Sequence, residues 1–101
     1  MAVRHLNEQS FDEARNSEGT VLLDFFADWC GPCRMLAPVL ETVAKERPDV
    51  LVAKVNVDEC PALAGEFGVF SIPTLVVMKN GKVVSQAVGV QPKDRLLALL
   101  D

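Results

Sequence analysis

The sequence is short of the residues that mark several classes of protein. Only three of its 101 residues are cysteine, and glycine and proline number six each. Three cysteines are too few for a small disulfide-held scaffold, and so little glycine and proline excludes collagen and flexible low-complexity chains. No apolar run approaches the roughly 18 residues that a membrane-spanning helix needs. We see no targeting segment either, and we expect a cytoplasmic protein with no membrane attachment.

The net charge of the chain is small and negative. Ten lysines and arginines stand against fourteen aspartates and glutamates, which gives a net charge of -4, and the basic residues are scattered. Nucleic-acid binding needs clustered lysine and arginine to neutralise phosphates, so we expect no nucleic-acid partner. Half of the residues are hydrophobic, which is enough apolar surface to offset the ordering entropy of folding. The length suits one domain, residues 1–101, with a single core.

Apolar patterning alternates between strand-like and helix-like segments. An unbroken apolar run predicts a strand covered on both faces, whereas apolar residues three and four apart predict a helix. Asn80-Gly81 between two β-prone runs predicts a hairpin, because both residues tolerate positive φ. The expected strands are Ala2–His5, Val21–Ala27, Leu51–Val57, Thr74–Lys79 and Lys82–Val88. Four helices are expected: one that follows an N-cap at Asn7, two that cover Pro32–Arg47 and Pro61–Phe67, and one that begins at Pro92.

The resulting order, βαβαβαββα, predicts an α/β fold with a mixed five-stranded sheet and helices on both faces. Strands separated by helices should be parallel, and the hairpin should add antiparallel strands. On the helices, we expect Met35, Leu36 and the Leu96–Leu100 stripe to face the core.

The motif Trp29-Cys30-Gly31-Pro32-Cys33 lies where a predicted buried strand gives way to a helix. Cys30 therefore falls at the helix N-terminus, where unpaired N–H groups and the positive end of the helix dipole favour an anion. The thiolate is the nucleophile of thiol–disulfide exchange, so this position favours the reactive form of Cys30. Cys33 lies one turn further along, placed to attack a mixed disulfide on Cys30, and Pro32 sets the first helical turn.

The sequence resembles the thioredoxin family over essentially its whole length. A lone Cys-x-x-Cys is a weak signal, but here an acid precedes the first cysteine by six residues and Ile-Pro-Thr follows about forty residues later. The resemblance implies the thioredoxin fold and a thiol–disulfide oxidoreductase that reduces disulfides in target proteins. The matching positions are Asp24-Phe25, Ala27, Trp29 to Cys33, Met35, Ala37-Pro38, Lys54 to Asp58, Ile72-Pro73-Thr74, Lys79-Asn80-Gly81 and Gly89.

The resemblance implies a role for each matching side chain. Cys30 is expected to be the attacking thiolate and Cys33 the resolving one. Asp24 is expected to be a buried acid that accepts a proton from Cys33, and Lys54 its neighbour on the adjacent strand. Pro73 is expected to be a cis-proline opposite the disulfide. The docking patch for targets comprises Trp29, Gly31, Pro32, Ile72, Pro73 and Gly89, with the Ile72 backbone free to pair with an extended target segment.

The resemblance also implies partners and cofactors. The sequence has no nucleotide-binding glycine loop, so electrons should arrive from a separate thioredoxin reductase that uses a flavin and NADPH. The redox group on this chain would be the Cys30–Cys33 disulfide, with no bound cofactor and no metal. Disulfide-containing proteins are the expected substrates. We expect a monomer, since the only apolar patch that we expect to be exposed is already assigned to docking.

Structural interpretations compete with some of these roles. A buried carboxylate raises its pKa, which suits a proton acceptor near neutral pH, so we favour function over a merely structural Asp24. Lys54 fits equally well as a strand lysine whose ammonium reaches solvent. Pro73 would be read as a trans proline at a strand edge without the resemblance. Cys60 is more simply a small, half-buried residue than a regulatory thiol.

Other functions stay open. A zinc half-site is one, but the remaining candidate ligands, His5 and Cys60, are distant in sequence from the cysteine pair. A second alternative is a binding subunit that docks a larger enzyme through the same apolar patch. A third is an oxidase or isomerase of the same fold, although Gly31-Pro32 argues against it because oxidising relatives usually carry a histidine there. Two departures from the family pattern, Phe26 for a usual tryptophan and Phe70-Ser71 before Ile72, put target preference in doubt.

Overall fold

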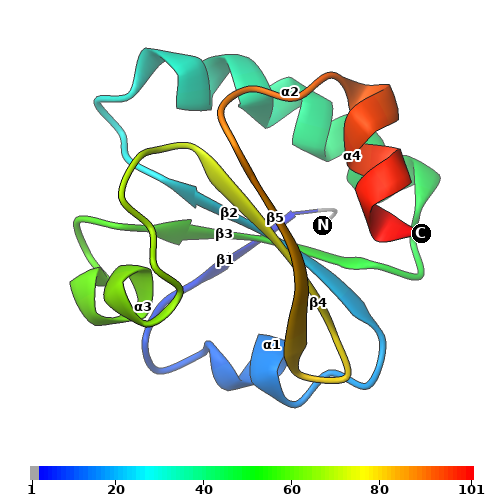
Figure 1. Ribbon diagram of the computed structural model, residues 1–101, viewed down its shortest axis with the longest axis horizontal. Coiled ribbons are helices and arrows are strands. Elements are labelled where there is room, and N and C mark those ends of the chain that lie inside the picture. Colours follow the sequence, from blue (N-terminus) through cyan, green and yellow to red (C-terminus); the bar gives the residue numbers. More distant parts are fainter. Residues whose placement is uncertain (1–2) are drawn as a thin grey trace.

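The computed structural model describes residues 3–101, which form a five-stranded sheet with helices on both faces (Figure 1). The sheet order is β1-β3-β2-β4-β5. The strands are β1 (Val3–Leu6), β2 (Thr20–Phe26), β3 (Leu51–Asn56), β4 (Thr74–Lys79) and β5 (Lys82–Val88), and the helices are α1 (Asp12–Arg15), α2 (Gly31–Glu46), α3 (Pro61–Glu66) and α4 (Lys93–Leu100). None of the helices within residues 3–101 has the length and apolar character needed to cross a bilayer.

The predicted fold class is confirmed. β3 pairs in parallel with β1 and β2, while β4 pairs antiparallel with both β2 and β5. Helices α2 and α4 lie on one face of the sheet, and α1 and α3 lie on the other (Figure 1). Two apolar clusters fill the space between the sheet and each helix pair. β2 lies at the centre and is buried on both faces, which explains why its sequence after the half-buried Thr20 is apolar with Asp24 as the exception.

The β4–β5 hairpin turns as the Asn-Gly pair predicts. Asn80 has φ 53° and Gly81 has φ 77°, so both residues occupy the left-handed region that this turn requires. A Cβ on Gly81 would lie 2.7 Å from the Arg15 carbonyl oxygen. Glycine is therefore needed here both for its backbone conformation and for the close approach of α1.

Several expected boundaries shift by a residue or more. The Asn7 side chain accepts a hydrogen bond from the Ser10 N–H at 2.9 Å, but this closes a turn, and α1 begins only at Asp12. Helix α2 begins at Gly31, which makes Cys30 the N-cap. Pro92 precedes α4 as its N-cap. Residue 2 of the expected first strand lies outside the described residues.

One core assignment was wrong. Met35 is 68% exposed, whereas its neighbour Leu36 is fully buried. Successive residues of a helix point about 100° apart, and in α2 the face toward the sheet is taken by Leu36, Leu40 and Val43. Met35 lies outside that face although its spacing to Val39 fits an apolar stripe.

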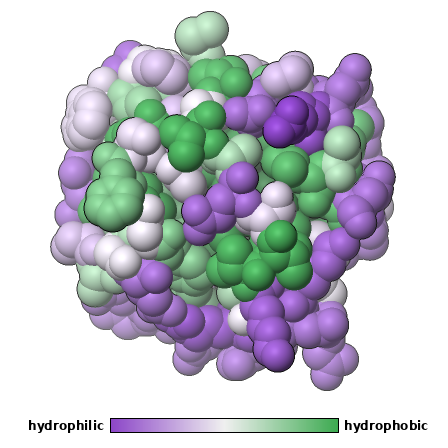
Figure 2. All heavy atoms as spheres, viewed as in Figure 1, coloured by the Kyte–Doolittle hydropathy of each residue, from purple (hydrophilic) through white to green (hydrophobic). Residues whose placement is uncertain are grey.

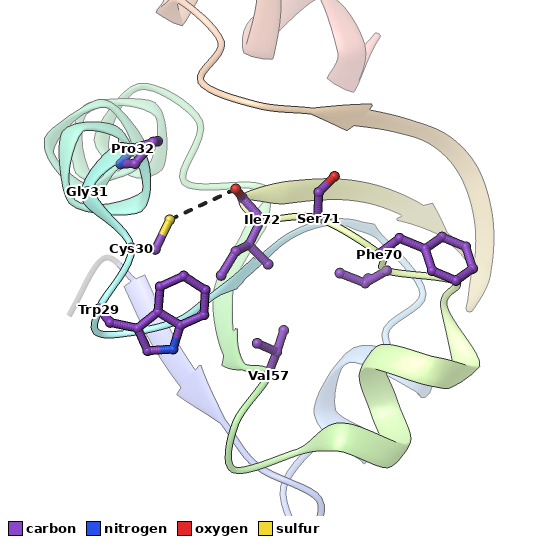
Figure 3. A pocket seen from close by; sticks show the side chains of 9 residues that line it. Trp29, Cys30, Gly31, Pro32, Val57, Phe70, Ser71 and Ile72 are labelled. Carbon is purple, nitrogen blue, oxygen red and sulfur yellow. Dashed lines mark hydrogen bonds between the residues drawn. The ribbon is translucent and has the colours of Figure 1, made fainter.

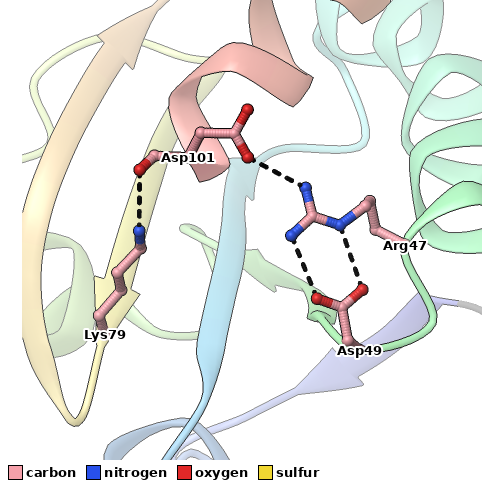
Figure 4. A network of polar contacts seen from close by, with 4 residues as sticks. All are labelled: Arg47, Asp49, Lys79 and Asp101. Carbon is pink, nitrogen blue, oxygen red and sulfur yellow. Dashed lines mark hydrogen bonds and ion pairs between the residues drawn. The ribbon is translucent and has the colours of Figure 1, made fainter.

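Surface ion pairs join the end of α2 to the C-terminal end of the chain (Figure 4). The Arg47 guanidinium contacts the Asp49 carboxylate at 3.1 Å and that of Asp101 at 3.4 Å. Lys79 Nζ donates to the Asp101 carbonyl oxygen at 3.3 Å. Because these groups are exposed, the contacts add little stability, but they place the end of α4 beside the sheet.

Candidate active site

The cysteine pair lies at the junction of β2 and α2. β2 ends at Phe26, three residues follow, and Cys30 caps the helix that Gly31 begins. The helical turn brings Cys30 and Cys33 to disulfide distance, with their Cα atoms 5.3 Å apart. Both are nearly covered, at 4% exposed for Cys30 and 2% for Cys33.

The helix N-terminus acts directly on the first sulfur. The backbone N–H of Cys33 donates a hydrogen bond to Cys30 Sγ at 3.2 Å. Pro32, at the second helical position, has no N–H to compete for that sulfur. A donor aimed at sulfur, added to the positive end of the helix dipole, favours the thiolate of Cys30 when the disulfide is reduced.

A groove of about 470 Å³ opens beside Cys30 (Figure 3). The start of α2 forms one wall with Trp29, Gly31 and Pro32, and the opposite wall comprises Val57, Val69, Phe70, Ser71 and Ile72. Cys30 Sγ lies 3.9 Å from the Ile72 carbonyl oxygen across this space. The lining of the groove is therefore mostly apolar, and its polar groups include Cys30 Sγ and the Ile72 carbonyl oxygen.

The predicted docking patch is only partly assembled along this groove. Trp29, Gly31, Pro32 and Ile72 line it, whereas Pro73 is buried and neither Pro73 nor Gly89 is among the lining residues. The Ile72-Pro73 bond is cis, as the resemblance implied. The Gly89 N–H donates to the Pro73 carbonyl oxygen at 2.8 Å. Gly89, with φ 93°, thus holds the proline loop through its backbone N–H.

Exposed apolar residues are also present away from the groove. On β5, Val83, Val84 and Val88 are each exposed by 45% or more. On the face seen in Figure 2, apolar side chains form patches interrupted by polar ones. These valines are exposed apolar side chains outside the docking patch, which was the only apolar patch that the sequence analysis expected to be exposed.

Asp24 is the buried acid that the sequence predicts. It is fully buried on β2, and neither carboxylate oxygen has a hydrogen-bond partner within the described part of the chain. Burial raises the pKa of Asp24 to about 7, against an ordinary value of 3.8, while the charge of Lys54 acts to lower it. The carboxyl group can therefore take up or release a proton near neutral pH.

Lys54 lies directly opposite Asp24 in the β2–β3 register. Its ammonium does not contact that carboxylate; it lies 4.3 Å from the centroid of the Phe26 ring. A hollow of about 320 Å³ is lined by Lys54, Phe26 and Cys33, among others. Cys33 and Lys54, the neighbour of Asp24, therefore border one small hollow.

The sequence analysis did not identify Val57 and Val69, which line the groove, or Asp58, which contacts Trp29, as site residues. The indole N–H of Trp29 donates to the Asp58 carboxylate at 2.8 Å, which holds the exposed tryptophan at the groove edge. Val57 follows β3 directly, and β3 lies parallel to β2. The carboxyl ends of parallel neighbouring strands meet at one sheet edge, so the end of β3 could have been assigned to the site.

Cys60 is buried at the start of α3 in the apolar cluster that α1 and α3 cover. Burial raises the pKa of its thiol, so the thiolate form is disfavoured. Within residues 3–101, no group of three or more histidine, cysteine, aspartate or glutamate side chains could hold a metal ion.

Fold and site together define a class of protein. A mixed sheet that presents a Cys-x-x-Cys disulfide at a helix N-terminus, beside a cis-proline loop and an apolar groove, is a thiol–disulfide oxidoreductase of the thioredoxin fold.

Comparisons with known proteins agree. The family model "Thioredoxin" matches residues 2–101. Thioredoxin of Bacillus subtilis strain 168 is 51% identical over 102 aligned residues, covering 100% of this chain and 97% of the relative. Thioredoxin of Alicyclobacillus acidocaldarius is 50% identical, covering 98% and 95%. Among solved structures, a mutant thioredoxin from Halobacterium salinarum NRC-1 superposes with a TM-score of 0.90 at 44% identity, covering 97% of this chain and 87% of that one.

The chain belongs to the thioredoxin family. It is a disulfide oxidoreductase whose redox group is the Cys30–Cys33 pair, and members of the family carry no bound cofactor. Its substrates are disulfide-containing, and a reductase is its partner in general terms.

Proposed function

We propose that this chain reduces disulfides in cytoplasmic target proteins, working as a monomer of one domain, with Cys30 as the nucleophile. The hydrogen bond from the Cys33 N–H to Cys30 Sγ is the observation that carries this assignment. It distinguishes the two sulfurs, because only Cys30 lies at the helix N-cap with an amide aimed at it.

In the first step, the Cys30 thiolate attacks one sulfur of a target disulfide. A Cys30–target bond forms, the target S–S bond breaks, and the other target sulfur leaves as a thiolate that takes a proton from solvent. Trp29, Pro32 and Ile72 supply apolar contacts along the groove for the target segment. The Ile72 carbonyl oxygen lies 3.9 Å from Cys30 Sγ, so an extended target segment that pairs with the Ile72 backbone, as when a strand is added to a sheet edge, would lie beside the reacting sulfur.

In the second step, Cys33 loses its proton and attacks Cys30 Sγ. The Cys30–Cys33 bond forms, the mixed disulfide breaks, and the second target thiolate departs, so two electrons have passed to the target. Asp24 accepts the proton of Cys33, directly or through a water, because its carboxyl group titrates near pH 7. Lys54 tunes that acceptor by its charge.

The oxidised chain then needs two electrons from outside. We assign their delivery to a flavin-dependent thioredoxin reductase that draws on NADPH. The support is the family membership and the Cys30–Cys33 pair, which is the redox group on this chain.

The experiment that tests this function is reduction of insulin by dithiothreitol with catalytic amounts of the protein. Cys30→Ser and Cys33→Ser should each abolish the acceleration, and Cys60→Ser, a matched change of the third cysteine, should leave it intact. A Cys30→Ser variant that still accelerates reduction would overturn the assignment. A measured reduction potential well above that of the glutathione pool would instead indicate an oxidase.

A further inference from the structure

Asp24 and Lys54 are opposite charges held in register that do not pair. They are Cα partners across the β2–β3 ladder, so their side chains leave the same face of the sheet. Both Asp24 oxygens nevertheless lack a hydrogen-bond partner, and no carboxylate oxygen within residues 3–101 lies within 4.0 Å of the Lys54 ammonium. Something other than a carboxylate holds the ammonium.

The ring of Phe26 is that partner. Phe26 follows Asp24 by two residues on β2, so its side chain is on the same face as Asp24 and Lys54. The Lys54 ammonium lies 4.3 Å from the ring centroid, well inside the roughly 6 Å over which a cation is attracted to an aromatic face. Phe26 is itself only 9% exposed, so the contact is shielded from water on the ring side.

We propose that Phe26 is a positioning residue whose ring holds the Lys54 ammonium off the Asp24 carboxylate and so keeps that carboxyl group free to take the proton of Cys33. The inference rests on the proton-accepting role proposed for Asp24. A direct ion pair would hold Asp24 in its charged, deprotonated form and weaken it as a base. An ammonium held at the ring still acts on Asp24 by its charge, but less strongly.

The other charged and titratable groups around Lys54 come from β1, from α2 and from the loops that follow β2 and β3. The ring of His5, on β1, meets Phe26 edge-on at 6.2 Å between centroids. Asp28, after β2, and Glu59, after β3, line a hollow together with Lys54 and His5. Cys33 and Arg34, on α2, line the hollow on the other side, and Arg34 Nε donates to the Asp28 carbonyl oxygen at 3.3 Å.

The test is a titration of the Asp24 carboxyl carbon by NMR in the oxidised protein. In Phe26→Leu, which removes the aromatic face, the midpoint should fall by roughly one pH unit as the ammonium moves toward Asp24. Phe26→Met repeats the change with a longer apolar side chain in case the first variant folds poorly. Phe26→Trp, which keeps an aromatic face, should leave the midpoint at or above that of the wild type.

A Lys54→Met background separates two possible causes of a lower Asp24 midpoint, movement of the ammonium and entry of water. Water entering past a smaller side chain would also lower the midpoint, but that effect would persist without the lysine. We expect Phe26→Leu to have no effect in the Lys54→Met background, and the pH profile of insulin reduction to shift to lower pH only when Lys54 is present. An unchanged midpoint in Phe26→Leu, or an equal fall without the lysine, overturns the inference. The proposed function would still stand in that case, because its own tests, the activity of Cys30→Ser and the reduction potential of the cysteine pair, do not depend on Phe26.

Discussion

The backbone N–H of Cys33 points at Cys30 Sγ from 3.2 Å, so the second cysteine of the pair stabilises charge on the first through its main chain. In the proposed mechanism, the Cys33 side chain is the group that later displaces the target. In that mechanism, one helical turn supplies both the hydrogen-bond donor that stabilises the Cys30 thiolate and the thiol that resolves the mixed disulfide. The Gly31-Pro32 spacer makes this possible, because it places the two cysteines three residues apart at a helix start.

The first prediction concerns the reactivity of Cys30. In a Cys33→Ser/Cys60→Ser double variant, the rate of Cys30 alkylation by iodoacetamide should reach its half-maximum below the pH of about 8.5 at which a free cysteine ionises. The reason is the helix N-terminus, which favours the thiolate. A half-maximum equal to that of a cysteine in a model peptide would contradict the catalytic account.

The second prediction concerns the pH dependence of stability. The folded-state pKa of Asp24 is about 7 and its ordinary value is 3.8, so between these pH values the folded protein holds a proton that the unfolded chain has released. Stability from this group is therefore present at low pH and is lost as pH rises from about 4 through 7. With 1.36 kcal/mol for each pH unit, the total loss is on the order of 4 kcal/mol.

Asp24→Asn should remove most of that dependence. At pH 8 we expect the variant to be more stable by about 1–3 kcal/mol, because a buried, unpartnered amide still costs part of the gain. At pH 5 the advantage should disappear. Urea unfolding at both pH values measures this, with Asp12→Asn as an exposed-acid control that keeps the wild-type slope. Disulfide exchange should be slower in Asp24→Asn, and a variant that is less stable at pH 8 yet equally active would remove Asp24 from the mechanism.

The third prediction compares two glycines. Gly81→Ala should destabilise the fold by about 1–3 kcal/mol, because Gly81 has φ 77° and a Cβ would lie 2.7 Å from the Arg15 carbonyl oxygen. Gly65→Ala is the matched control, since it lies in α3 with nothing within 4 Å of the added Cβ. Alanine there should be neutral or stabilising by up to about 1 kcal/mol. The melting temperatures of the two variants, measured by thermal unfolding, test this difference. Equal melting temperatures would show that the turn tolerates a side chain.

The fourth prediction concerns target preference. Phe70 is 99% exposed at the outer rim of the groove, with its ring turned toward solvent (Figure 3). Phe70→Ser should raise KM about five-fold for peptide disulfides with a bulky apolar residue next to the attacked cysteine, on the order of 1 kcal/mol of lost contact. It should leave kcat unchanged, because the reacting sulfurs are untouched. Val84→Ser, an exposed apolar residue on β5, is the control, and an equal rise in KM there would make the effect non-specific.

Local signals predicted most of the architecture. The Asn80-Gly81 pair fixed the hairpin because the conformational demands of a two-residue turn are met by few residues. The apolar run in β2 predicted two-sided burial for the same local reason. Where the pattern was ambiguous, prediction failed: Asn7 closes a turn instead of starting a helix, and Met35 is exposed although its spacing fits an apolar stripe.

The amino-acid order by itself determined the Cys30–Cys33 spacing, the start of α2 at this motif and the place of Asp24 on β2, because each depends on neighbours within a few residues. Only the tertiary structure decided that Asp58 holds Trp29, that Gly89 braces Pro73 and that the Lys54 ammonium lies on the Phe26 ring. These contacts join segments that are far apart along the chain, and their geometry follows from how the sheet and the loops at its edge pack in three dimensions.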